Sequence, residues 1–262
     1  MMRAYGSPFQ LGVPPVVKNL LIINGLFFFA KTAFGNDDLG INKLDHLFSL
    51  HWFTSPHFRP WQLVTHMFMH ADIGHLLSNM FGLFMFGSSL EFLWKSKRFL
   101  VYYMVCGLGA AGLHMAVEWR SVHAAETSAA VHHVMVDDVL DANLVAHEDL
   151  ALAEKELAQA SRDEDGAIAA HELFWTYEST MLGASGAIFG ILLAFGMMFP
   201  NEIVFAGFFL PLPAKFLVII YGGMEFYRGF TGSQDGVAHF AHLGGMVVGF
   251  FLILYWKKKV LL

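Results

Sequence analysis

The chain has 262 residues, of which 56% are hydrophobic and only 15% carry a charge. Its mean hydropathy is +0.51 and its formal net charge is −6. This composition excludes an ordinary soluble domain and indicates an integral membrane protein, and no basic patch points to nucleic acid as a partner.

A transmembrane helix needs ~20 mostly apolar residues, and six apolar segments of the chain come close to this length. In chain order they are residues 16–33, 73–93, 99–117, 182–199, 213–227 and 238–256. The fifth is the shortest and carries Glu225 near one end. The apolar stretch 204–210 is too short to span and lies between two prolines, which predicts a loop or an interfacial segment. We therefore expect an all-α membrane protein with six transmembrane helices.

Charged residues orient these segments. Basic residues follow the second segment at 95–98 and the last segment at 257–259, so the positive-inside rule places both on the cytoplasmic side. Both termini are then cytoplasmic. The expected parts are a cytoplasmic N-terminal segment (1–15), helices one to three with the first outer loop (16–117), an acidic extracytoplasmic insert (118–181), helices four to six (182–256) and a basic cytoplasmic tail (257–262). No targeting presequence is plain, so we expect a bacterial plasma membrane.

The insert differs in composition from the rest of the chain, because it carries 14 of the 22 acidic residues. Residues 139–159 are rich in Ala, Leu, Glu and Asp and predict a helix, which a turn at 163–166 ends. Its histidines lie near many carboxylates, which leaves a metal site as an alternative, but no spacing matches a tight ligand motif, so we expect a solvated face and no cofactor. These histidines are His123, His132, His133, His147 and His171. The single cysteine, Cys106, lies in a predicted helix and is expected to fill the core.

Polar residues inside the apolar segments are functional candidates, because a polar group at membrane depth is costly. His75 and Asn79 are four residues apart in the second segment and share a helix face. Ser185 lies between two glycines in the fourth segment, and His242 lies at the start of the sixth. All three segments enter from the outside, so these residues are expected at similar depth.

Glycines accompany Ser185 and His242 at a spacing of four residues. Gly186 and Gly190 form one stripe, and Gly245 and Gly249 form another on the face of His242. Small residues at this spacing let helix backbones approach closely. If the two stripes face one another, Ser185 and His242 come within hydrogen-bond reach.

A serine hydroxyl becomes a nucleophile when a positioned base takes its proton, and His242 is the natural base for Ser185. No acidic residue is placed to orient His242, because Asp235 lies seven residues earlier and is expected outside the membrane. The sequence therefore predicts a catalytic dyad rather than a triad.

Acyl transfer also needs donors for the developing oxyanion. The Asn79 amide, the His75 imidazole and the Ser185 backbone N–H are the candidates. Gly183 and Gly186 would let the scissile carbonyl approach the backbone closely.

Other interpretations are open for each residue. Ser185 alone is more often packing, Asn79 can bridge helices, and His242 can satisfy a backbone carbonyl; their joint occurrence at one depth favours chemistry. Ala187 replaces the last glycine of the G-x-S-x-G elbow, which argues against a tethered α/β-hydrolase. A six-span transporter is disfavoured because the polar residues cluster at one depth and no inverted repeat is visible.

Three motifs occur in order along the second, fourth and sixth segments. They are His75-Leu-Leu-Ser-Asn79, Gly183-Ala-Ser185-Gly186 and Ala241-His242-Leu-Gly-Gly245-Met-Val-Val-Gly249. With them the sequence closely resembles the rhomboid family of intramembrane serine proteases. The resemblance implies a rhomboid-like six-helix bundle in which Ser185 is the nucleophile, His242 is the general base, and His75, Asn79 and the Ser185 amide hold the oxyanion.

The resemblance also extends to supporting positions. His70 matches a recurrent family position, and Glu91 resembles an acidic residue that ties the cytoplasmic end of the second helix. Phe189 falls where many members carry an aromatic, often Tyr, that stacks on the catalytic imidazole. Gln62 stands where many members have Arg in the first outer loop, and the insert departs most from the family pattern.

The implied partners are transmembrane protein substrates and the lipid bilayer. A helical substrate hides its carbonyl groups in hydrogen bonds and must unwind locally before attack. An alternative to the protease is a catalytically silent rhomboid-like protein that binds transmembrane clients, which the intact set of candidate residues disfavours.

Overall fold

The computed structural model describes residues 12–37, 39–206, 210–232 and 237–260. It forms two compact units. The first unit falls within Met1–Leu26, His70–His114 and Gly183–Leu262, and the second comprises Phe27–Met69 and Met115–Leu182. The two units are described separately below.

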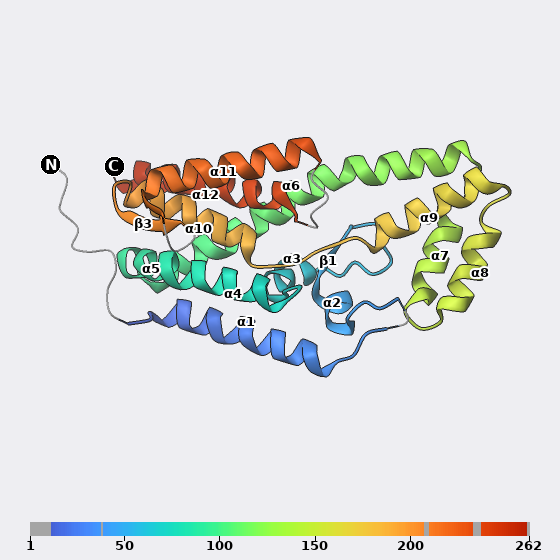
Figure 1. The fold of residues 1–262 in the computed structure, drawn as a ribbon, viewed down its shortest axis with the longest axis horizontal. Coiled ribbons are helices and arrows are strands. Elements are labelled where there is room, and N and C mark those ends of the chain that lie inside the picture. Colours follow the sequence, from blue (N-terminus) through green and yellow to red (C-terminus); the bar gives the residue numbers. More distant parts are fainter. Residues whose placement is uncertain (1–11, 38, 207–209, 233–236, 261–262) are drawn as a thin grey trace. The chain divides into compact units, whose positions relative to one another are not determined.

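All four long apolar helices lie wholly or partly in the first unit. Figure 1 shows the helices and strands along the chain. The elements of the first unit are α1 (Pro15–Ala33, which continues into the second unit), α4 (Ile73–Gly82), the π-helical turn η2 (Leu83–Gly87), α5 (Ser88–Trp94), α6 (Ser96–Val131, which also continues), α10 (Ser185–Met198), β3 (Ile203–Ala206), β4 (Leu210–Pro213), α11 (Ala214–Thr231) and α12 (His239–Val260). The prediction of a mostly helical membrane protein is confirmed.

Within the described residues, four helical stretches are long and apolar enough to cross a membrane. They are Pro15–Ala33, Ile73–Trp94, Ser96–Val131 and His239–Lys258. Helix α10 is apolar but has only 14 residues. Helix α11 carries Lys215, Glu225 and Arg228, which lowers its apolar character. The count of six spans therefore stays a prediction.

The expectation of a loop or interfacial segment at 204–210 is wrong in part. Residues 204–206 and 210 lie in β3 and β4, which pair antiparallel with Val204 opposite Leu212 and Ala206 opposite Leu210, whereas 207–209 lie outside the described residues. Pro211 and Pro213 lie within β4. A two-stranded ribbon tolerates proline because each strand is an edge with unpaired positions.

The N-terminus of α1 is tied to the end of α5 through Glu91. The Glu91 carboxylate accepts the backbone N–H groups of Val16 and Val17 at 3.0 and 2.8 Å, and the hydroxyl of Ser96 at 2.6 Å. The first N–H groups of a helix lack partners within the helix, and a carboxylate satisfies them and complements the positive end of the helix dipole.

Glycines allow α10 and α12 to touch through their backbones. A Cβ atom added at Gly245 would overlap the carbonyl group of Gly186, and one added at Gly190 would lie 3.0 Å from the Gly245 carbonyl oxygen. Cys106 is fully buried beside Gly190, where its sulfur fills the space that a side chain would need. The two glycine stripes thus face one another and bring the N-terminal ends of α10 and α12 together.

The second unit combines residues 27–69, which include the expected first outer loop, with residues 115–182, which include the expected insert. Its elements are α2 (Lys43–Phe48), β1 (Leu50–His51), α3 (Gln62–Thr65), the 3₁₀ turn η1 (His66–Phe68), α7 (Val136–Ala146), α8 (Leu150–Gln159), α9 (Glu164–Glu178) and β2 (Thr180–Met181). Strands β1 and β2 pair antiparallel, with Leu50 opposite Met181.

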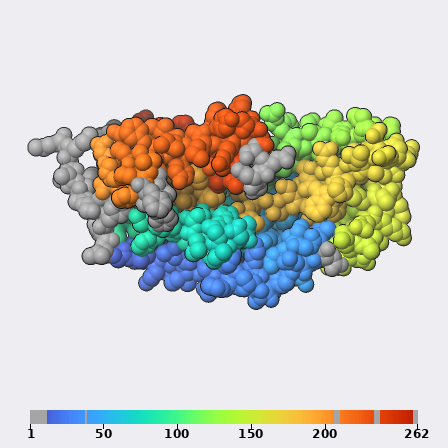
Figure 2. All heavy atoms as spheres, viewed as in Figure 1, coloured from blue at the N-terminus to red at the C-terminus, as the bar shows by residue number. Residues whose placement is uncertain are grey.

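The insert shares one hydrophobic core with the earlier part of this unit, since Trp52 belongs to the same cluster and Leu39 packs against it. Small side chains on α7, such as Ala142 and Ala146, pack with Leu173 and Phe174 of α9. On the face seen in Figure 2, side chains fill the spaces between the ribbons of α7, α8 and α9. The helical prediction for 139–159 is confirmed except at 147–149, where the chain turns. The predicted turn at 163–166 is wrong in part, because Asp163 caps α9 and Glu164 opens it.

Candidate active site

Ser185 and His242 meet in the first unit. Ser185 is the first residue of α10, and His242 lies in the first turn of α12. The Ser185 hydroxyl lies 2.8 Å from Nε2 of His242. This is a short hydrogen bond between a potential nucleophile and a potential base.

A carboxylate lies on the other side of the imidazole. Oε2 of Glu225, on α11, is 2.8 Å from Nδ1 of His242. The expectation that no carboxylate orients His242 is therefore wrong. Because Nδ1 donates its hydrogen to the carboxylate, Nε2 carries the lone pair that can accept the serine proton. Asp235, the acidic residue seven positions before His242, lies outside the described residues.

His239 shares the same carboxylate oxygen. Its Nδ1 atom lies 2.7 Å from Oε2 of Glu225, and its side chain is buried. The ligand atoms of Glu225, His239 and His242 lie within 4.8 Å of one another, so these three residues could also hold a metal ion. Two N–H donors on one carboxylate oxygen already satisfy the group without an ion.

Phe189 fixes the plane of the His242 ring. The two rings are parallel within 8° and their centroids are 4.2 Å apart. Phe189 lies on α10 one turn after Ser185, so the helix that carries the hydroxyl also carries the aromatic face. Together with the hydrogen bond to Glu225, this contact leaves the His242 imidazole little freedom to rotate away from Ser185.

His75 lies beside the glycine that precedes Ser185. A Cβ atom added at Gly183 would lie 2.8 Å from Cε1 and Nε2 of the His75 ring, and the backbone φ of Gly183 is +122°. Both features require glycine at this position. The backbone N–H of Ala71 donates to Nδ1 of His75 at 3.4 Å, which leaves the ring hydrogen on Nε2. His75 thus directs a donor toward the chain before Ser185.

Asn79 offers a second donor. It lies one turn after His75 on α4, is 5% exposed, and its Nδ2 atom donates to no acceptor within the described part of the chain. The Ser185 backbone N–H is a third donor, because the first N–H groups of a helix have no acceptor within it. His70 is fully buried and packs edge-to-face on His75, with ring centroids 5.0 Å apart.

Gln62, which stands where many rhomboid family members have Arg, has a bracing role within the second unit. Its side chain is fully buried. Its amide oxygen accepts the N–H groups of His51 and Arg59 at 3.3 and 3.2 Å, and its amide nitrogen donates to the carbonyl groups of Leu47 and His57 at 3.3 and 3.0 Å. A neutral amide therefore braces the outer loop through four backbone groups.

The sequence missed Glu225 although a signal was present. A carboxylate within an apolar segment is a functional candidate by itself. It was instead counted as a weakness of the fifth segment, because sequence spacing could not show that α11 packs on α12.

Comparison with known proteins gives two findings. A family model described as the rhomboid domain matches residues 57–136 and 166–259. The chain is 28% identical over 233 residues to RHOMBOID-like protein 12, mitochondrial, of Arabidopsis thaliana, which is 89% of this chain and 56% of that protein. The chain thus spans about half the length of this curated relative. The matched residues include Asn79, Ser185, Glu225 and His242.

Proposed function

The chain belongs to the rhomboid family, and from this premise we propose that it is an intramembrane serine endopeptidase. It is an integral membrane protein, and its proposed substrates are transmembrane segments of other membrane proteins. The observation that carries the proposal is the chain of hydrogen bonds from Ser185 through His242 to Glu225.

Acylation follows from this arrangement. The Ser185 oxygen attacks the scissile carbonyl carbon while Nε2 of His242 takes the hydroxyl proton. The carbonyl oxygen becomes negative and is held by Nδ2 of Asn79, Nε2–H of His75 and the Ser185 N–H. The C–N bond then breaks, and the His242 imidazolium gives its proton to the leaving amine.

Deacylation repeats the steps with water. His242 takes a proton from a water molecule, whose oxygen attacks the acyl carbon, and the ester bond to Ser185 breaks as the serine regains its proton. Glu225 acts through His242 and touches no reacting atom, so we assign it as a positioning residue.

The membrane topology is part of the proposal. We assign α10 and α11 as the two spans beyond the four long helices. A row of exposed apolar side chains on α11, among them Ile219, Phe226 and Phe230, suits lipid. The basic residues at 95–98 and 257–259 support cytoplasmic termini and cleavage near the outer face. A bacterial plasma membrane remains the prediction from the sequence.

Cleavage of a model transmembrane substrate by the purified full chain in detergent tests the proposal. Ser185→Ala and His242→Ala are expected to lower cleavage by about 10⁴-fold or more. A matched control is Ser89→Ala, because Ser89 is a buried serine on α5 whose hydroxyl only contacts the Met85 carbonyl. A fluorophosphonate probe is expected to label the wild type and Ser89→Ala but not Ser185→Ala.

The outcomes separate the alternatives. Cleavage at the wild-type rate in both active-site variants would remove the assigned roles. A chain that neither cleaves nor reacts with the probe, yet still binds the substrate helix, would be the catalytically silent rhomboid-like protein instead.

A further inference from the structure

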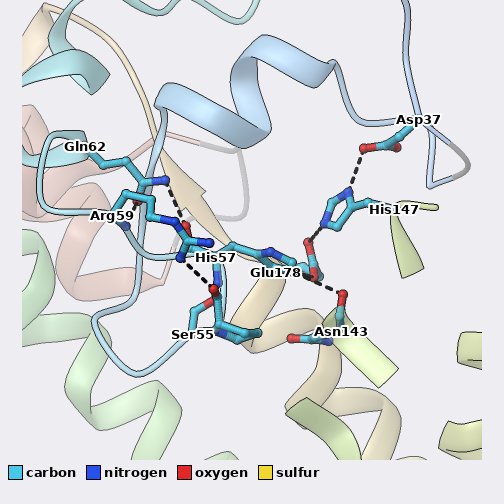
Figure 3. A network of polar contacts seen from close by, with 9 residues as sticks. Asp37, Ser55, His57, Arg59, Gln62, Asn143, His147 and Glu178 are labelled. Atoms are coloured by element: carbon cyan, nitrogen blue, oxygen red, sulfur yellow. Dashed lines mark hydrogen bonds and ion pairs between the residues drawn. The ribbon is translucent and has the colours of Figure 1, made fainter. Parts of the chain in front are cut away.

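Histidines and carboxylates also gather in the second unit, where the proposed protease chemistry does not use them. His46 lies on α2, His57 follows β1, His147 ends α7, and Glu178 ends α9. Asp37 lies in the loop before α2. Figure 3 shows the side chains of His57, His147, Glu178 and Asp37 converging from separate segments of this unit.

Two carboxylates hold the His147 ring between them (Figure 3). Its Nδ1 atom lies 2.7 Å from Oδ2 of Asp37, and its Nε2 atom lies 3.0 Å from Oε2 of Glu178. The side chains of His147, Asp37 and Glu178 are 8%, 4% and 1% exposed. The expectation that His147 lies on a solvated face is therefore wrong.

Two further rings complete the cluster. His57 places Nε2 3.5 Å from Oε1 of Glu178 and 3.1 Å from the backbone oxygen of Asn143. The ring of His46 lies 3.7 Å from that of His147 and 4.4 Å from that of His57, centroid to centroid. Within the described residues, Nε2 of His46 is buried and makes no hydrogen bond.

We propose that His46, His57, His147 and Glu178 bind a divalent transition metal, with Zn²⁺ as the best match. One ligand atom from each of the three histidines lies within 4.8 Å of the others. Imidazole with carboxylate is a ligand set that zinc prefers. Ligands about 2.0–2.2 Å from a tetrahedral zinc lie about 3.3 Å apart. Oε2 of Glu178 lies 3.0 Å from Nε2 of His147 and its Oε1 lies 3.5 Å from Nε2 of His57, so the carboxylate stands between the two rings at about this spacing.

Asp37 contacts the ring nitrogen of His147 that would not bind the metal. A histidine that binds zinc commonly donates its other ring N–H to a carboxylate, which fixes the ring and its tautomer. Asp37 stands at this position for His147, since it contacts Nδ1 and leaves Nε2 directed at Glu178. His57 would exchange its contact with the Asn143 carbonyl for the metal.

The charges of the cluster agree with this site. Burial and the neighbouring His147 and His57 lower the pKa of His46 to about 3, so this ring is neutral, as a ligand must be. Burial alone would raise the pKa of Glu178, but hydrogen bonds from His147 and His57 outweigh it and lower the pKa to about 2. Two buried carboxylates balance the charge of one divalent cation, which would replace the proton of His147.

The metal would join two parts of the chain that are distant in sequence. His46 and His57 belong to the outer loop, whereas His147 and Glu178 belong to the insert. Ligands from separate segments stabilise the folded form, because the unfolded chain does not hold them together. The acidic insert would thus be fastened to the outer loop within this unit.

Zinc binding by the full chain, purified in detergent without a polyhistidine tag, tests this proposal. The experiment uses the Ser185→Ala background, so its outcome is independent of protease activity. After chelator treatment, Zn²⁺ is titrated in competition with a chromophoric chelator, and Co²⁺ is added to report tetrahedral ligands by its visible absorption. The variants are His147→Gln, His57→Gln and Asp37→Asn, and the matched control is His171→Gln, an exposed histidine on α9.

We expect the parent and His171→Gln to bind about one zinc per chain, with tetrahedral cobalt spectra. His147→Gln and His57→Gln should lose more than about 100-fold in affinity, and Asp37→Asn about 10- to 100-fold, because it removes only the orienting carboxylate. Elution of each variant as the parent does in size-exclusion chromatography establishes folding. No zinc binding by the parent, or equal affinity in His147→Gln and His171→Gln, would overturn the proposal and leave His147 as a cation between two carboxylates.

Discussion

Two buried histidines of this chain lie between pairs of partners, and the partners differ. His242 has a carboxylate on Nδ1 and a hydroxyl on Nε2. His147 has carboxylates on both nitrogens. A ring with one carboxylate partner keeps a lone pair on its other nitrogen, which can accept a proton. A ring between two carboxylates instead favours a bound positive charge, either a proton or a metal ion. The second partner of the ring thus separates the two proposed roles, a base for His242 and a cation site for His147.

The elements that position the His242 and His147 rings differ as well. His242 lies on a helix whose glycines touch the backbone of α10, so its position depends on helix packing. His147 lies where α7 ends, and its partners come from a loop and another helix end. Packed helices fix atoms without a ligand, whereas a site assembled from loops gains more from one.

Among the changes that test this comparison, the largest effect is expected where the carboxylate partner of His242 is removed. Glu225→Gln keeps the shape of the side chain but no longer favours the Nδ1–H tautomer or the imidazolium. We expect kcat for a transmembrane substrate to fall about 10³-fold with little change in KM, and fluorophosphonate labelling to slow in parallel.

A loss of packing alone would lower the unfolding temperature without this separation of kcat from KM. His239→Gln is the matched control, because it removes the other donor on the same oxygen and leaves the contact with His242. A Glu225→Gln variant with kcat within about threefold of wild type would contradict a positioning role.

The second effect concerns Asn79, whose buried amide is assigned to the oxyanion. Asn79→Ala is expected to lower kcat about 10²-fold, the usual consequence of losing one such donor. Asn24→Ala is the control, since Asn24 is a fully buried asparagine on α1 whose amide donates within its own helix to Leu20. Equal kcat values for the two variants would remove Asn79 from the site.

The contrast between the two histidines also explains what the sequence could predict. Ser185 and His242 were found because local features, the small residues around each, implied close helix packing. Glu225 was missed because its contact with His242 joins two helices, and its distance of seventeen residues has no helical period. The long apolar helices were predicted from length and hydropathy, except that the third, expected to end at 117, continues to Val131 and takes in the first residues of the predicted insert.

The histidine cluster was missed for a related reason. His46, His57 and His147 lie eleven and ninety residues apart, so no motif spacing could suggest a site. The pairing of β3 with β4 was missed because it is visible only in three dimensions. Long-range pairing, rather than local propensity, separates these elements from those that were predicted.

The third effect tests the claim that helix packing supports His242. Gly245→Ala would drive a methyl group into the Gly186 carbonyl, and we expect it to lower the free energy of unfolding by about 2 kcal/mol. Gly223→Ala on α11 is the control, because an added Cβ there meets no atom within 4 Å. It should be neutral or stabilising by up to about 1 kcal/mol, as alanine favours helix. Thermal unfolding in detergent measures both, and equal unfolding temperatures would contradict the packing argument.

The smallest effect is expected in the second unit, where Gln62 braces the loop that carries His57. Gln62→Met keeps the volume but removes an amide that serves four backbone groups, and neighbouring water can replace part of it. We expect the local stability of the outer loop to fall by about 1 kcal/mol, measured as faster hydrogen exchange at His51 and Arg59. Because this brace and the histidine cluster share the His57 segment, added Zn²⁺ should restore part of the protection. Unchanged exchange at both residues would mean that the loop is held by its apolar contacts rather than by the buried amide.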